Sequence, residues 1–151
     1  MKGKIGVTMA AIWCLLFLPV IVQSQYTPKQ MERMQAAGEW MATAVMCAYT
    51  APLLEWSKSL YDEGEIAGED CAKVAEAVKT LAEVFGKRAE KIKNATVKKE
   101  AVAYAKCIVA EADAYVKYYK GDKKAIETAE KFSKEAEMHI EAINKYLNPE
   151  E

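Results

Sequence analysis

Residues 36–56 read AAGEWMATAVMCAYTAPLLEW, and this stretch decides how the rest of the chain must fold. Glu39 and Glu55 are its only charged residues. A surface helix normally shows one apolar stripe and one polar face, whereas a helix over this stretch is apolar or small on nearly every side. We therefore predict that it is covered on most sides by the rest of the chain, by sister subunits or by lipid.

The bulky side chains of this stretch point to more than one flank. Helical spacing puts Met41 on one side, Trp40 about 100° away and Trp56 on the opposite flank. Apolar surface on several flanks exceeds what one small bundle covers, and it predicts an interface with other subunits. The interface candidates are Trp40, Met41, Met46, Tyr49, Leu53 and Trp56.

The composition restricts the class of protein. The chain has 151 residues, which is enough for one domain, and its 7 Gly and 4 Pro favour long helices. Lys plus Arg is 21, Asp plus Glu is 22, and the sequence pI is about 6.0. A nucleic-acid-binding protein usually shows a basic stripe or a high pI, so we expect no nucleic-acid partner.

The N-terminus has the pattern of an export signal. Lys2 and Lys4 precede an uncharged, mostly apolar run over residues 5–22, and Ser24 is a small residue before a cleavage point at Gln25. The run is also close to the ~18 residues of a membrane span. We predict that residues 1–24 are a signal peptide, with a retained transmembrane anchor as the alternative. A secreted, periplasmic or cell-surface domain over residues 25–151 follows, anchored to the membrane if the signal is not cleaved.

The remaining sequence predicts an all-α, up-down four-helix bundle. Apolar residues recur at spacings of three and four, with Lys and Glu between them, and the connections are short. The expected helices cover residues 28–59, 69–93, 97–119 and 122–147. The last one has the clearest heptads. Ile126, Ser133, Ile140 and Leu147 share one heptad position, and Ala129, Ala136 and Ile143 share the other.

Local signals mark the helix ends. Thr27 and Gln30 can form a capping box at the start of the first helix, and Pro52 predicts a kink near Ala48. Gly121 favours a left-handed turn before the last helix.

Asn94 carries two predictions. Either Asn94 or Thr96 can cap a helix that starts at Val97, which predicts a break in place of one helix over residues 69–119. Asn94-Ala95-Thr96 is also an N-glycosylation sequon on that expected turn. In an exported chain this sequon makes Asn94 a candidate glycan site.

The cysteines raise the question of pairing, because export implies an oxidising compartment. At ~1.5 Å rise per residue, Cys47 lies roughly 21 Å and Cys107 about 23 Å from the first turn of the bundle. This equal height predicts a Cys47–Cys107 disulfide with Cys71 unpaired. The alternative is that all three are buried thiols that pack as small apolar residues.

Nothing in the sequence has the pattern of a catalytic centre. His139 is the one histidine, and no CxxC, HExxH or phosphate-loop motif occurs. We therefore expect no enzyme activity, no metal site and no cofactor. The alternative with a cofactor is a b-type haem carried by His139 and either Met31 or Met34, with Met34 preferred, an axial pair similar to that of four-helix b-type cytochromes.

The third helix is rich in tyrosine. Tyr104, Tyr115, Tyr118 and Tyr119 fall on or near its inner side. We predict that they form the rim of the core, with packed rings and solvated hydroxyls. A ligand or partner patch is the alternative.

Together these features favour an exported, non-catalytic helical bundle with a structural or interaction role. It would self-assemble or pack on partner subunits through its apolar first helix. One alternative is an accessory subunit of a membrane complex that keeps its N-terminal span. The other is a small haem or ligand carrier.

Overall fold

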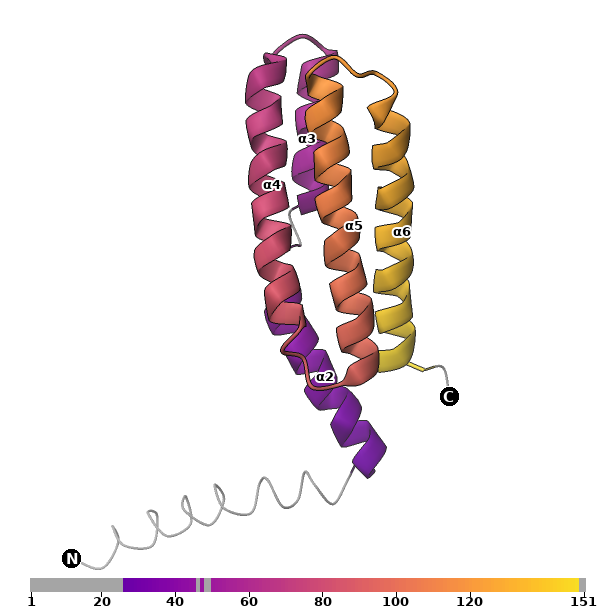
Figure 1. The fold of residues 1–151 in the computed structure, drawn as a ribbon. Coiled ribbons are helices and arrows are strands. Elements are labelled where there is room, and N and C mark those ends of the chain that lie inside the picture. Colours follow the sequence, from indigo (N-terminus) through magenta and orange to yellow (C-terminus); the bar gives the residue numbers. More distant parts are fainter. Residues whose placement is uncertain (1–25, 46, 48–49, 150–151) are drawn as a thin grey trace, which may run out of the picture. The chain divides into compact units, whose positions relative to one another are not determined.

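A computed structural model describes residues 26–45, 47 and 50–149 of the chain. Within these residues the fold is all-α and has no strand, which confirms the predicted class. The predicted signal or anchor over residues 1–24 lies outside the described part. The described residues form five helices, which are α2 Pro28–Ala44, α3 Thr50–Asp62, α4 Gly68–Ala89, α5 Ala95–Tyr119 and α6 Ala125–Leu147 (Figure 1).

The chain divides into two compact units, residues 1–35 and residues 36–151. In the first unit, α2 begins with the predicted capping box. The Thr27 backbone N–H donates to Gln30 Oε1 at 2.7 Å, and the Gln30 N–H donates to Thr27 Oγ1 at 3.2 Å. This reciprocal pair satisfies two of the N–H groups that a helix start leaves without partners.

The predicted continuous helix over residues 28–59 is wrong, because α2 ends at Ala44 and α3 begins at Thr50. At the first residue of α3, the Thr50 hydroxyl donates to the Cys47 carbonyl oxygen at 2.7 Å. Pro52 then falls in the first turn of α3, where a missing N–H costs no intrahelical hydrogen bond. Because of the break, Pro52 does not interrupt the interior of a helix. The kink was predicted near Ala48, which lies outside the described residues.

The break between the second and third predicted helices is confirmed. Asn94 caps α5 and accepts a hydrogen bond from the Val97 N–H at 3.0 Å. The turn before α6 is confirmed as well, since Gly121 has φ of 106°, a conformation that costs glycine little. The last helix begins at Ala125, later than predicted, because Asp122 is used in the turn, where its carboxylate accepts from the Lys124 N–H.

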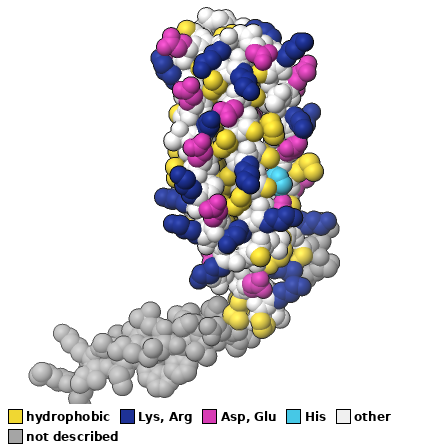
Figure 2. All heavy atoms as spheres, in the orientation of Figure 1, with side chains coloured by type: hydrophobic (Ala, Val, Ile, Leu, Met, Phe, Trp, Pro, Cys, Tyr) yellow, Lys and Arg dark blue, Asp and Glu magenta, His cyan; other side chains and the backbone are white. Residues whose placement is uncertain are grey.

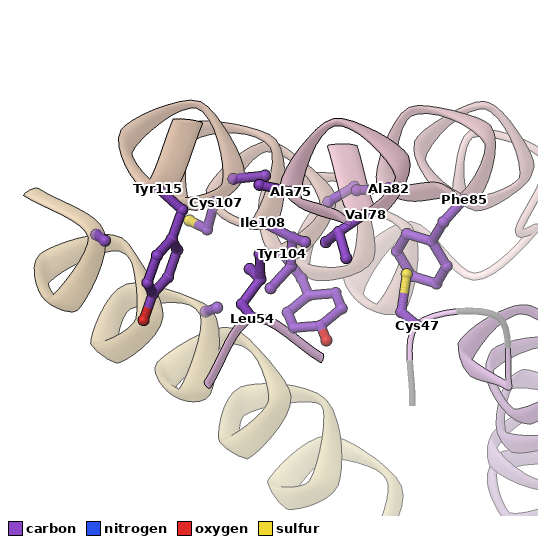
Figure 3. Packing of buried hydrophobic residues seen from close by; sticks show 14 of the residues in the cluster. Cys47, Leu54, Ala75, Val78, Ala82, Phe85, Tyr104, Cys107, Ile108 and Tyr115 are labelled. Carbon is purple, nitrogen blue, oxygen red and sulfur yellow. The ribbon is translucent and has the colours of Figure 1, made fainter. Parts of the chain in front are cut away.

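Helix α5 is the centre of the packing. It packs against α4 on one side and α6 on the other, while α3 packs mainly against α4 and also reaches α5. Consecutive helices α3, α4 and α5 run antiparallel, as Figure 1 shows. The core between them holds Leu54 from α3, Phe85 from α4 and Ile108 from α5 (Figure 3). Figure 2 shows acidic and basic side chains interspersed over the visible surface, with apolar patches between them.

Candidate functional site

Glu111 is the one acidic side chain that is buried in the described part of the chain. It lies on α5, is 2% exposed, and its Oε2 atom has no hydrogen-bond partner. Burial raises the pKa of Glu111 to about 7, against a hydrogen bond from Ser133 that lowers it. A buried carboxyl with such a pKa changes its protonation near neutral pH. Glu111 is therefore the best candidate for a chemically responsive site.

The surroundings of Glu111 come from three helices. The charges of Glu55 on α3 and Glu137 on α6 add to the rise of its pKa. Burial raises the pKa of Tyr115, and Glu111 is the next largest cause. The site is thus acidic and aromatic, and it favours a proton or another cation over an anion.

Sequence reasoning missed Glu111, although a signal was present. The residue lies seven positions after Tyr104 and four before Tyr115, and both tyrosines are buried. These spacings place all three on one side of a helix. Glutamate is normally a surface residue, so only the helical position of Glu111 relative to the two tyrosines indicates that it is buried.

A second polar cluster joins α3 to α5. The Ser57 and Tyr119 hydroxyls lie 2.6 Å apart, and the Tyr118 hydroxyl donates to Asp62 Oδ1 at 2.5 Å. Lys123 Nζ lies 4.5 Å from the centre of the Tyr118 ring. The prediction of solvated tyrosine hydroxyls is therefore wrong for Tyr118 and Tyr119, because the end of α3 supplies internal partners.

The three cysteines in the described part of the chain do not pair with one another. Cys47, Cys71 and Cys107 are free, buried thiols, so the predicted Cys47–Cys107 disulfide is not formed in the structure. Burial raises the pKa of Tyr104 to about 12, with Cys47 as a further cause, so these two residues are close. Tyr104 is only three residues from Cys107, ~4.5 Å along the axis. Cys47 and Cys107 therefore lie at similar heights along the bundle, as predicted. Their side chains do not pair because they point in different directions.

The two thiols point to different parts of the core. The charge of Glu135 on α6 raises the pKa of Cys107 after burial does, so this side chain lies toward α6. Figure 3 shows Cys47 and Cys107 apart from each other within the cluster of buried hydrophobic residues. Burial also raises the pKa of Cys47 to about 12, and a thiol that holds its proton so tightly is a poor nucleophile. The Cys71 Sγ atom donates to the Ser57 carbonyl oxygen at 3.4 Å.

Two of the interface candidates belong to the core of the chain itself. Trp40 is buried and packs edge-to-face on Phe85 and Tyr104, with ring centroids 6.0 and 6.3 Å away. Leu53 is half-buried against the same core. The chain itself therefore covers Trp40 fully and Leu53 in part.

The other described candidates are exposed. Met41 is 61% and Trp56 is 58% exposed, and Val45, which follows Met41 by one helical turn, is 67% exposed. Met46 and Tyr49 lie outside the described residues. Apolar side chains of this size are uncommon on the surface of a monomer when they gather in one segment.

His139 has a partner within the fold. Its Nδ1 atom lies 2.7 Å from Glu100 Oε2, and this hydrogen bond is the main reason why the pKa of Glu100 is lowered. Met34 is an exposed residue of α2. The haem alternative stays a prediction.

Asn94 uses both ends of its side-chain amide. Its Oδ1 atom accepts from the Val97 N–H, and its Nδ2 atom donates to the Tyr146 hydroxyl at 2.8 Å. A glycan would be attached at Nδ2 and would replace the bond to Tyr146. Glycosylation at this residue stays a prediction.

No group of three or more His, Cys, Asp or Glu side chains in the described part could hold a metal ion. None of its helices is long and apolar enough to cross a membrane. No family model, curated protein or solved structure matches the chain.

Proposed function

We propose that this chain is an exported, non-catalytic helical bundle with a structural or interaction role, and that it self-associates through the exposed apolar residues of α2 and α3. In this proposal α3 to α6 form an up-down four-helix bundle. The N-terminal pattern of residues 1–24 supports export. The observation that supports an interface most directly is the exposure of Met41, Val45 and Trp56.

Trp56 is the strongest evidence for an interface, because it is exposed and is not part of the buried core. Its neighbours Leu54 and Ser57 are buried, and helical spacing puts Trp56 on the opposite side of α3. Covering such a side chain removes on the order of 100 Å² of apolar surface from water, which contributes ~2–3 kcal/mol to association. Tryptophan is also among the residues that most often dominate binding energy at interfaces.

Sedimentation velocity of the protein purified from its own host tests this proposal. We expect a weight-average mass that rises with concentration, and a Trp56→Ser variant whose dissociation constant is roughly tenfold higher or more. Met138→Ser is the matched control, because Met138 is an exposed residue of α6. A protein that stays monomeric at every concentration, or an equal effect of both substitutions, would contradict self-association through this surface.

A further inference from the structure

The N-terminal half of α6, residues 125–136, is held to the bundle mainly by small side chains. We call it the latch segment. Its buried residues are all alanines, namely Ala125, Ala129 and Ala136. A buried alanine removes much less apolar surface from water than a buried leucine or isoleucine does. Among the described helices, α6 packs closely against α5 alone, so the latch segment can separate without disturbing the packing of α3, α4 and α5.

A surface cleft of about 380 Å³ lies between the latch segment and α5. Asp113 and Lys117 of α5 line it on one side, and Thr128 and Phe132 of α6 line it on the other. Tightly packed protein interiors leave few voids larger than a water molecule. The cleft therefore shows that the contact of the latch segment with α5 is incomplete, and its polar lining admits water.

The C-terminal half of α6 is fixed more firmly. His139 Nδ1 lies 2.7 Å from Glu100 Oε2 on α5, and the Tyr146 hydroxyl accepts a hydrogen bond from Asn94 Nδ2 at 2.8 Å. This half also buries Ile143. The two halves of α6 therefore differ in what holds them, and the latch segment is the half that opens at lower cost.

Glu111 of α5 lies beneath the latch segment, since the Ser133 hydroxyl donates to its carboxyl group. The side chain is 2% exposed, and its Oε2 atom has no hydrogen-bond partner in the described part of the chain. A buried carboxylate with one unpartnered oxygen is costly to the folded state, whereas the protonated acid is tolerated. Moving the latch segment away would give the carboxylate access to water.

The charged groups near Glu111 oppose its ionisation. Glu55 of α3 and Glu137 of α6 both raise the pKa of Glu111 through their negative charges. Lys134 lies one helical turn from Glu137 and from Glu130, but it is exposed, and water and salt screen its charge. No nearby charge listed for α3 or α6 therefore compensates an ionised Glu111 in the closed structure.

The remaining neighbours of Glu111 stay uncharged or are paired elsewhere. On α5, burial raises the pKa of Cys107 and Tyr115, and Glu111 raises both further, so these two groups are neutral at physiological pH. On α4, Lys79 Nζ lies 2.8 Å from Asp113 Oδ1. Asp113 follows Glu111 by two residues, so this pair lies on another side of α5.

We propose that Glu111 is a proton-controlled latch for residues 125–136. While Glu111 is protonated, it stays buried and the latch segment stays closed against α5. When Glu111 ionises, the latch segment moves away from α5 far enough for water to reach the carboxylate. The exposed residues of α2 and α3 take no part in this device, so it does not depend on self-association.

The direction of the pH dependence follows from proton linkage. Opening returns Glu111 to water, where its pKa is 4.5, whereas the closed structure raises this pKa to about 7. The open fraction therefore increases as the pH rises between these two values and is constant above them. For these pKa values, the opening equilibrium increases roughly 50-fold from pH 5.0 to pH 7.5.

Hydrogen exchange of the intact protein, followed by mass spectrometry of its peptides, tests the latch. Exchange rates are divided by the intrinsic rates at each pH. We expect residues 125–136 to be at least tenfold less protected at pH 7.5 than at pH 5.0. At pH 7.5 they should also be at least tenfold less protected than α4, which reports opening of the whole bundle.

Glu111→Gln should remove the pH dependence of protection in the latch segment, because glutamine cannot ionise. Glu127→Gln, at an exposed residue of the same segment, is the matched control and should behave like the wild type. Ser133→Ala keeps Glu111 but removes its hydrogen-bond donor, so the difference between the two pH values should grow.

Three results would overturn the proposal. Equal protection of residues 125–136 and α4 at pH 7.5 would show that the segment does not open by itself and that Glu111 affects only global unfolding. A pH dependence that persists in Glu111→Gln would assign the opening to another group. An unchanged pH dependence in Ser133→Ala would show that Glu111 is not coupled to the latch segment.

Discussion

Replacing Glu111 by glutamine should make the stability of the protein less dependent on pH. The folded state raises the pKa of this carboxyl from 4.5 to about 7, so the folded protein holds the proton more tightly than the unfolded chain does. Each pH unit between these values is worth about 1.4 kcal/mol, so ionised Glu111 costs the folded state ~3 kcal/mol. Glutamine keeps the shape of the side chain and removes the charge.

The sign of the effect follows from proton linkage. A carboxyl whose pKa is raised on folding contributes no penalty below the unfolded pKa of about 4.5. The penalty grows as the pH rises to 7 and is fully present above it. The free energy of unfolding of Glu111→Gln minus that of the wild type should therefore increase by ~3 kcal/mol between about pH 4 and pH 8.

Urea unfolding followed by far-ultraviolet circular dichroism measures this difference at each pH. Other titratable groups are present in both proteins, so their contributions cancel in the difference. Glu127→Gln serves as the control, because Glu127 is exposed, and its difference from wild type should stay constant. A constant difference for Glu111→Gln as well would refute the account of Glu111 as a buried carboxyl with a raised pKa.

Three further predictions concern stability and thiol chemistry. A Cβ at Gly68 would lie 2.5 Å from the Tyr119 carbonyl oxygen, so Gly68→Ala should lower the free energy of unfolding by about 1–3 kcal/mol. Gly38→Ala, where a Cβ meets no atom within 4 Å, should instead raise the free energy of unfolding by up to ~1 kcal/mol. Urea melts in which Gly68→Ala is the more stable of the two variants would contradict both predictions. Asn94→Ala should cost about 1 kcal/mol through loss of the cap on Val97, whereas Asn94→Asp keeps an acceptor there and should cost less. The three described cysteines should react with a thiol reagent only after unfolding, and fast labelling of the folded protein would show that they are not buried as described.

Features that depend on local chemistry could be predicted from the sequence. The break before α5 needs only a residue that caps a helix, and Asn94 does so with its Oδ1 atom. The turn before α6 needs a residue that adopts positive φ, which Gly121 supplies. Each of these signals acts over three or four residues, so the rest of the fold has little influence on it.

Features that depend on the rotation of a helix within the bundle were harder to predict. The height of Cys107 was estimated from helical rise, but height does not say which neighbour a side chain faces, and this cysteine lies toward α6. The burial of Glu111 is hard to predict for a related reason, since a charged side chain is normally exposed. A buried glutamate is rare enough that composition argues against it, and only its spacing from Tyr104 and Tyr115 argues for it.

The break in the first predicted helix separates the apolar residues that fold the chain from those that the fold leaves exposed. Because α2 and α3 are separate helices, each can turn its own apolar side inward, so Trp40 from α2 and Leu54 from α3 are both buried. A continuous helix would have tied their directions together. The same break leaves Met41 and Trp56 exposed, although they come from the same apolar stretch. Core packing explains why Trp40 and Leu54 are apolar, but it does not explain Met41 and Trp56. Exposed large apolar side chains promote aggregation unless something covers them, so a binding role accounts for Met41 and Trp56 better than folding does.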